Sequence, residues 1–147
     1  MVLKLKQDLS QTDIEISIIY PEKNRKIKRI VSFINSIDSE IECNFNNSTK
    51  LLNVSNIYYI ESYDNNTIIF CQNENYNIKD RLYQVYNKLT DKGFAQISKY
   101  CIVNVNKLEK FTFMPNSCME ATLSNGKNLK ITRKYITDIK RIMREEL

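Results

Sequence analysis

The stretch GFAQISKYCIVNVNKLEK, residues 93–110, contains two short apolar segments separated by a polar, basic interruption. FAQIS predicts one strand, and CIVNV predicts a second strand that is apolar enough to be buried on both faces. A companion stretch, SNGKNLKITRKYITDIK at residues 124–140, begins with an Asn-Gly hairpin signal, for which we expect a type I′ turn. A strand and an Arg-Lys pair that opens a helix follow this turn. The two stretches therefore predict a sheet with basic residues at the ends of its strands.

The composition limits the class of function. The 147 residues are 42% hydrophobic, which is enough for one domain with its own core. The chain has no histidine, the commonest general base and metal ligand, and its two glycines are too few for a phosphate-binding glycine loop. We therefore expect no metal, no cofactor and no small-molecule substrate. A Ser98-Lys99 nucleophile is the one enzymatic alternative, and neither an oxyanion loop nor a third orienting group accompanies it.

The chain carries no sequence signal for a membrane or for secretion. No apolar run is long enough to span a bilayer, and the N-terminus lacks the apolar stretch of a signal peptide, so we expect a cytoplasmic protein. Four widely spaced cysteines without a CxxC pair predict reduced thiols, mostly in the core, rather than a zinc site or a disulfide framework. These residues are Cys43, Cys71, Cys101 and Cys118.

The net charge of +5 comes from the last third of the chain. Residues 1–48 carry seven basic and seven acidic residues, and residues 49–92 carry five of each. Residues 93–147 carry ten basic residues against five acidic ones. Such a concentration is typical of a surface that binds a polyanion, and its alternative is a solvated basic surface.

Residues 1–39 predict a strand followed by a helix. Ile14, Ile16 and Ile18 alternate within Asp13 to Pro21, as in a half-buried strand that proline ends. From about Glu22 to Ile37 an amphipathic helix is expected. Its apolar stripe either packs on the core or pairs two chains, and it consists of Ile27, Ile30, Val31, Ile34 and Ile37.

From Glu40 onwards the pattern becomes mostly β. Strands are expected at 41–45, 50–54, 56–62, 67–72, 74–79, 108–114, 118–124 and 128–132, besides the two quoted above. Turns are expected at 46–49, 64–66 and 115–117. A helix from about Lys79 to Thr90 has apolar residues at core spacing, namely Leu82, Val85, Tyr86 and Leu89. A last helix follows Thr132 as N-cap, with the apolar face Tyr135, Ile136, Ile139, Ile142 and Met143.

Three exposed polar segments are candidates for binding. They are the turn Tyr63 to Thr67, the triplet Ser98-Lys99-Tyr100, and Arg133 with Lys134. Lysine or arginine at a rigid strand end can donate to guanine, and asparagine can pair with the adenine edge. Taken singly, each segment is more often an ordinary turn or a surface charge than a binding site. The prediction therefore depends on the order in which the segments occur.

That order resembles the LytTR DNA-binding domain of bacterial transcription regulators. The resemblance rests on IYYIES, RLYQVYNKL, GFAQISKYCIVNVNKLEKF and LSNGKNLKITRKYITDIKRIM, and it covers about residues 40–147. It implies a fold that is mostly β with α, in which flanking helices surround a β-strand core. It also implies loops that dock into successive major grooves of bent double-stranded DNA, often as pairs of domains on repeated sites.

The resemblance also implies site residues. Base contacts fall on Asn65, Asn66, Thr67, Lys99 and Arg133. We expect phosphate contacts from Ser98, Tyr100, Lys107, Lys127, Lys130, Lys134 and Lys140. The triplet that commonly reads His-Arg-Ser in the family is Ser98-Lys99-Tyr100 here. Lysine lacks the planar fork of arginine, so Lys99 is expected to make a single bond to guanine or to contact phosphate alone.

The N-terminal part suggests how the regulator is organised. Residues 1–39 are too few for the receiver domain that many family members carry. We therefore expect a stand-alone regulator, with a strand-helix leader at 1–39, a candidate segment for dimerisation or regulation, and a DNA-binding domain at 40–147. Such regulators are often encoded beside a membrane protein that restrains them, which implies a membrane-bound partner. The main alternative is a non-catalytic protein-interaction adaptor, and single-stranded RNA binding is weaker because most tyrosines have core spacing.

Overall fold

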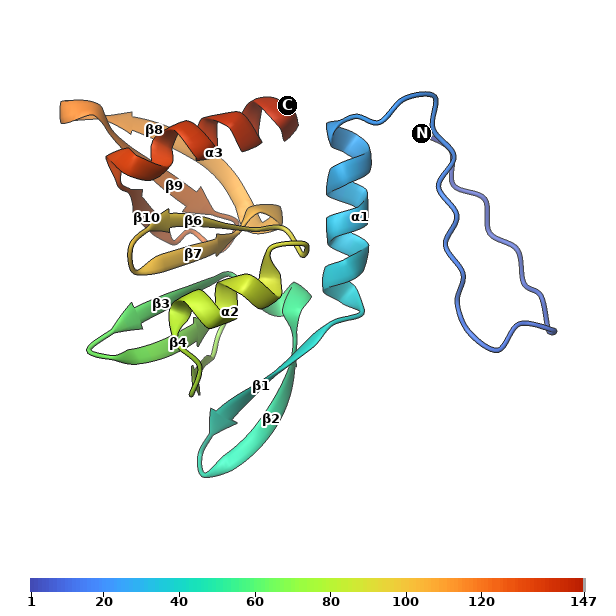
Figure 1. The fold of residues 1–147 in the computed structure, drawn as a ribbon, viewed down its shortest axis with the longest axis horizontal. Coiled ribbons are helices and arrows are strands. Elements are labelled where there is room, and N and C mark those ends of the chain that lie inside the picture. The colour runs from blue at the N-terminus through green and yellow to red at the C-terminus, as the bar shows by residue number, and fades with distance from the viewer. Residues whose placement is uncertain (147) are drawn as a thin grey trace.

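The fold is mostly β, with three helices. The computed structural model describes residues 1–146, and Figure 1 shows two sheets with α2 and α3 beside them and α1 at one end. The helices are α1 (Arg25–Ile37), α2 (Leu82–Leu89) and α3 (Arg133–Glu146), and the 3-10 turns are η1 (Val54–Asn56), η2 (Val105–Lys107) and η3 (Pro115–Ser117). The strands are β1 (Glu40–Phe45), β2 (Ser48–Asn53), β3 (Tyr59–Tyr63), β4 (Asn66–Phe70), β5 (Asn75–Ile78), β6 (Phe94–Ser98), β7 (Cys101–Asn104), β8 (Leu108–Met114), β9 (Cys118–Leu123) and β10 (Asn128–Ile131). The predicted fold class is confirmed.

The strands form two antiparallel sheets. The order in the larger sheet is β2-β1-β5-β4-β3-β7-β6, and in the smaller sheet it is β10-β9-β8. Most neighbours are consecutive hairpin strands, which the turn signals predict. The pairing of β3 with β7, in which Tyr59 lies opposite Val103, joins segments more than forty residues apart. This pairing and that of β1 with β5, in which Asn44 lies opposite Asn77, are the two non-local steps that assemble the larger sheet.

Two apolar clusters lie on opposite faces of the larger sheet. Ile60 and Ile102 belong to the cluster that includes the buried residues of α2, while Tyr59 and Val103 belong to the cluster shared with the smaller sheet and α3. Successive residues of a strand point to opposite faces, so this division follows from the register. Every residue of β7 is buried, which confirms the prediction of a strand buried on both faces.

Local caps set the starts of α1 and α2. The α1 helix begins at Arg25 rather than near Glu22, because the Asn24 side chain caps it by accepting a hydrogen bond from the Ile27 N–H (3.2 Å). The α2 helix begins at Leu82, where the Gln84 side chain accepts from the Arg81 N–H (2.8 Å). The α3 helix follows Thr132 as expected, although the side chain of Met143 lies outside the described residues. Within residues 1–146, no helix is both long enough and apolar enough to cross a bilayer.

The strand predicted at Asp13 to Pro21 does not form. Residues 14–20 have no regular secondary structure, and Ile14 and Ile19 are 86% and 96% exposed. An alternating pattern favours a strand only where another strand supplies hydrogen-bond partners, and no strand of the described chain pairs with this segment. Ile18 is the exception, since it is half-buried against α1 in the pocket described below.

The hairpin at Asn125-Gly126 is confirmed, but its predicted type I′ turn is wrong. Gly126 has φ +85°, whereas Asn125 does not have a positive φ, as a type I′ turn requires. The Leu123 N–H donates to the Lys127 carbonyl, so the loop has three residues with glycine in the left-handed position. Type I′ geometry appears instead at Asn46-Asn47 and Asp64-Asn65, where both residues have positive φ.

The two glycines give a matched test of packing. Both have φ +85°, but a Cβ at Gly93 would lie 3.0 Å from Asn106 Nδ2, while one at Gly126 would meet nothing within 4 Å. We expect Gly126→Ala to lower the free energy of unfolding by about 1 to 2 kcal/mol through backbone strain, and Gly93→Ala to lower it further. Urea denaturation of both variants measures this difference. Equal losses of unfolding free energy in the two variants would show that the Asn106 side chain can move away from the new Cβ without destabilising the protein.

Candidate nucleic-acid interface

The three predicted binding segments lie together at one edge of the molecule. The Ser62 N–H donates to the Tyr100 carbonyl (2.8 Å), which places the β6–β7 turn beside the β3–β4 turn. The Thr132 N–H donates to the Ile97 carbonyl (3.0 Å), so α3 begins beside the same β6–β7 turn. Together with η3 these segments form what we term the loop edge, residues 64–66, 98–100, 115–117 and 133–134, at the left of Figure 1.

The β3–β4 turn projects from this edge with a defined backbone. Asp64 and Asn65 have φ values of 48° and 61°, which matches the two-residue hairpin turn whose twist suits the flanking strands. The Asn66 side-chain amide donates to the Asp64 carbonyl (3.2 Å). Asp64, Asn65 and Asn66 are exposed. The turn therefore presents one carboxylate and two amide groups to solvent.

Thr67 does not share this exposure. It lies in β4, opposite Ser62 on one side and Ile78 on the other, and is only 4% exposed. A side chain this buried offers no surface to a base edge. The sequence already placed Thr67 at the start of a strand, and the pairing of β4 with both β3 and β5 buries its side chain. Thr67 is therefore a packing position in this structure, and the implied base contact has no exposed side chain to make it.

The Ser98-Lys99-Tyr100 turn presents a cation and an aromatic ring. Lys99 and Tyr100 are exposed, and the Lys99 ammonium lies 5.5 Å from the centroid of the Tyr100 ring. The Ser98 hydroxyl oxygen accepts a hydrogen bond from the Tyr100 N–H (3.1 Å), which shapes the turn. Ser98 is thus engaged within the turn, while Lys99 is the group directed outward.

Arg133 is positioned by a loop that sequence reasoning did not connect to it. Its Nη2 donates to the Asn116 carbonyl (2.9 Å), across 17 residues of sequence. Asn116 and Ser117 have φ values of 63° and 58°, which is why an Asn-Ser pair suits this tight turn. Guanidinium has five N–H donors, so most of them remain for a ligand. Pro115-Asn116-Ser117 signalled a hairpin, and nothing in that signal indicates an arginine partner.

The predicted phosphate contacts divide into two groups. Lys134 lies on the loop edge, Lys130 is exposed on β10 two residues before Thr132, and the Lys140 ammonium lies over the ring of Phe113 at 5.3 Å. Lys107 and Lys127 follow β7 and β9, at the ends of those strands that point away from the loop edge.

Lys107 and Lys127 contact other parts of the protein. The Ser124 N–H donates to the Lys107 carbonyl, and the ammonium groups of Lys107 and Lys127 lie 4.9 and 6.0 Å from the rings of Tyr58 and Tyr59. The sequence prediction grouped all these lysines by charge alone, and the strand directions separate them. Lys107 and Lys127 are therefore not part of the loop edge.

Two of the four thiols, Cys71 and Cys101, are unsuited to nucleophilic chemistry. The cysteines are free, as predicted, and burial raises the pKa of Cys101, which lies next to the β6–β7 turn. Burial also raises the pKa of Cys71 to about 11. Since the thiolate is the reactive form, these two groups stay protonated and inert at neutral pH.

The fold of the chain has a counterpart among solved structures. It superimposes on the LytTr DNA-binding domain of a putative methyl-accepting/DNA response regulator from Bacillus cereus, with a TM-score of 0.67 and 18% sequence identity. The match covers 72% of this chain and 97% of that one. At this level of identity the likeness concerns the fold.

Sequence comparison gives the family. Curated relatives are the sensory transduction proteins LytT of Bacillus cereus and Bacillus anthracis, each 24% identical over 97 residues, which cover 66% of this chain and 39% of each relative. The chain thus spans about two fifths of the length of these relatives. The family model for the LytTr DNA-binding domain matches residues 47–144, well over half of the chain. With this match and the fold agreeing, the chain belongs to the LytTR family of DNA-binding domains.

Proposed function

We propose that the chain recognises specific sequences in double-stranded DNA and thereby regulates transcription. The observation that carries this proposal is the loop edge, where three polar segments far apart in the sequence converge on rigid strand and helix ends. The basic excess of residues 93–147 supplies long-range attraction for a polyanion. Loops held by a stiff sheet can enter a major groove without a recognition helix.

Roles within the loop edge follow from the chemistry of each side chain. Arg133 can bond guanine O6 and N7 bidentately, while Lys99 supplies one bond to guanine or a phosphate contact. Asn65 and Asn66 can pair with adenine. Asp64 would be repelled by phosphate, so we place its turn over the base edges, where a carboxylate can accept from cytosine N4. Lys134 is placed on the phosphate backbone.

Lys134 gives a test that separates phosphate contacts from base contacts. Lys134→Ala should weaken binding to all duplex sequences alike and reduce the slope of log K against log salt by about one unit. Fluorescence anisotropy with cognate and scrambled duplexes over a salt series measures both effects. The control is Lys88→Ala, because Lys88 lies on α2 and pairs with Asp80. A loss confined to the cognate duplex would contradict the phosphate role.

Binding to repeated half-sites as a homodimer is part of the proposal. The apolar stripe of α1 is only partly covered by the rest of the chain. Val31 and Ile37 are 43% and 48% exposed. The other three residues of the stripe are half-buried, namely Ile27, Ile30 and Ile34. Linking two domains would raise their joint affinity for repeated sites. Sedimentation of the full chain and of Ile37→Asp tests this surface, and identical monomeric behaviour would discard it. A cytoplasmic location and a membrane-bound regulatory partner stay predictions.

Selection of bound duplexes from a random DNA pool, at two salt concentrations, tests the function itself. Enrichment of a repeated motif is the expected result. Equal recovery of all sequences at both salts would contradict sequence-specific binding and would favour the adaptor built on the same domain.

A further inference from the structure

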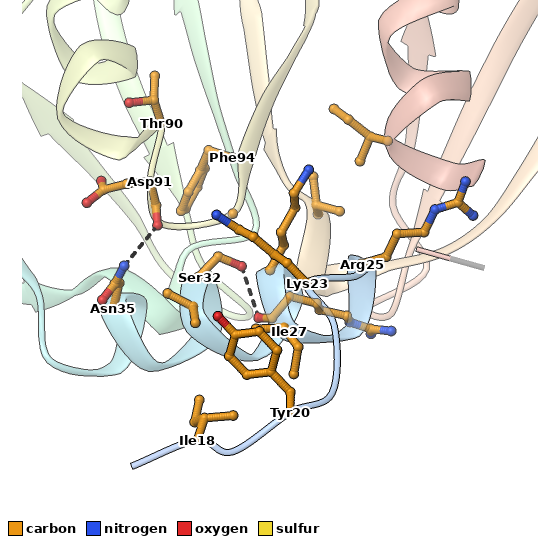
Figure 2. Close-up of a pocket in the computed structure, with 16 residues that line it drawn as sticks. Ile18, Tyr20, Lys23, Arg25, Ile27, Ser32, Asn35, Thr90, Asp91 and Phe94 are labelled. Atoms are coloured by element: carbon orange, nitrogen blue, oxygen red, sulfur yellow. Dashed lines mark hydrogen bonds between the residues drawn. The ribbon is translucent and has the colours of Figure 1, made fainter. Parts of the chain in front are cut away.

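A pocket of about 530 Å³ lies at the other end of the molecule from the loop edge. It is bounded by the segment before α1, by α1 itself, by the loop after α2 and by the C-terminal half of α3 (Figure 2). Gly93 and Val105, which line it, precede β6 and follow β7, so they lie at the strand ends opposite the 98–100 turn. Its volume is within the range of about 300 to 1,000 Å³ that is typical of small-molecule sites.

The lining combines an apolar surface with a cluster of cations. The apolar residues are Ile18, Ile27, Val31, Phe94, Val105 and Ile142. Phe94 and Val105 are also buried members of the two core clusters, so this side of the pocket is part of the rigid domain. The cations are Lys23, Arg25, Lys28 and Arg29, all within or just before the first turns of α1.

These cations are close together in the sequence, within residues 23–29, and the fold places them beside the apolar lining. Residues 1–48 have as many acidic as basic residues, yet none of those acidic residues lines the pocket. Asp91 is the one carboxylate among the described residues of the lining, and it bonds the Lys92 ammonium at 2.8 Å. Among the ion pairs of the described residues, none involves Lys23, Arg25 or Arg29. Lys23, Arg25 and Arg29 therefore give the described lining of the pocket a net positive charge.

The position of the cations on α1 strengthens the positive potential of the pocket. The partial positive charge at a helix N-terminus favours acidic residues there and basic residues at the C-terminus. In α1 the order is reversed, because its first turn contains no acidic residue and its last turn contains no basic residue. Arg25 and Arg29 thus add to the positive potential of the helix end. An anion bound in the pocket would offset both the charge of the arginines and the partial positive charge of the helix N-terminus.

We propose that this pocket binds a small amphiphilic anion, a carboxylate or phosphate group carried on an unbranched apolar chain. The anionic group would lie against Arg25 and Arg29 near the α1 N-terminus, and the chain against Phe94, Val105 and Ile142. An acidic peptide fits less well, because its backbone amides need partners. The polar side chains of Ser32 and Asn35 already donate to the carbonyls of Arg29 and Asp91, at 3.0 and 3.3 Å (Figure 2).

Calorimetric titration of the full chain with decyl phosphate, below the concentration at which it forms micelles, tests the proposal. We expect saturable binding at one site. Inorganic phosphate should bind at least tenfold more weakly, because it lacks the apolar chain, and decyltrimethylammonium should not bind, because its charge is reversed. Equal affinity for the anionic and cationic amphiphiles would overturn the proposal, since it would indicate non-specific apolar adsorption.

Two charge-matched double variants locate the binding. Arg25→Glu with Arg29→Glu should weaken decyl phosphate binding at least tenfold, and Arg133→Glu with Lys134→Glu should leave it unchanged. The first pair should fold, because both arginines are exposed and acidic residues favour a helix N-terminus. Lys23→Glu, before the helix, replaces it if circular dichroism shows a loss of structure. Loss of binding only in the loop-edge variant would overturn the proposal, as would stronger pocket-dependent binding of an acidic apolar peptide.

Discussion

Replacing Arg133 with alanine is expected to weaken binding to the cognate DNA site by about 1 to 3 kcal/mol and to relax the base preference at one position. The physical reason is the geometry at the start of α3. One guanidinium nitrogen is held by the Asn116 carbonyl at 2.9 Å, which fixes the direction of the planar fork and leaves its other donors for a base edge. Competition binding with duplexes that differ at single positions measures both the affinity and the preference.

Arg141→Ala is the matched control for this substitution. Arg141 lies on the same helix, carries the same charge and is exposed, but it pairs with Asp138 and is two turns away from the loop edge. It should leave the base preference unchanged. If Arg133→Ala left the base preference unaltered, Arg133 would not read a base and would contribute only its positive charge.

Replacing Ile97 with alanine should lower the free energy of unfolding by about 2 to 5 kcal/mol, the range for deleting a buried isoleucine side chain beyond its Cβ. Ile97 is fully buried in the cluster that joins β6 to the smaller sheet and to Ile139 of α3. Its carbonyl also accepts the hydrogen bond from Thr132 that sets where α3 begins. The cavity would therefore lie directly beneath the loop edge. Urea denaturation measures the loss.

Ile19→Ala is the control for Ile97→Ala, because it makes the same chemical change at a side chain that is 96% exposed. We expect a change within about 0.5 kcal/mol at this surface position. Similar losses in the two variants would mean that Ile19 is buried in solution, for example against a second chain. That outcome would contradict the exposed leader described above.

The sequence determined the elements whose signals are local. The hairpin turns, the apolar spacing of α2 and α3 and the doubly buried β7 were predicted because the residues that decide them are neighbours in the chain. The charged residues, counted along the sequence, show the basic excess of residues 93–147. The order of the motifs indicated the LytTR family, which the family model confirms. Lys99, Arg133 and the turn near Asn65 were correctly placed at element ends.

Only the tertiary structure decided what depends on non-local partners. Asp13 to Pro21 has the pattern of a strand, yet it remains unpaired because no other strand supplies its hydrogen bonds. Thr67 is a packing residue because β4 pairs on both sides, and Lys107 and Lys127 are removed from the loop edge by the direction of their strands. The Asn116 carbonyl meets Arg133 only in three dimensions, and so do the cations of residues 23–29 and the apolar residues Phe94, Val105 and Ile142. Local sequence fixes backbone preference and exposed polarity, whereas the pairing of β3 with β7 and the packing of the helices decide which of those polar groups face the same ligand.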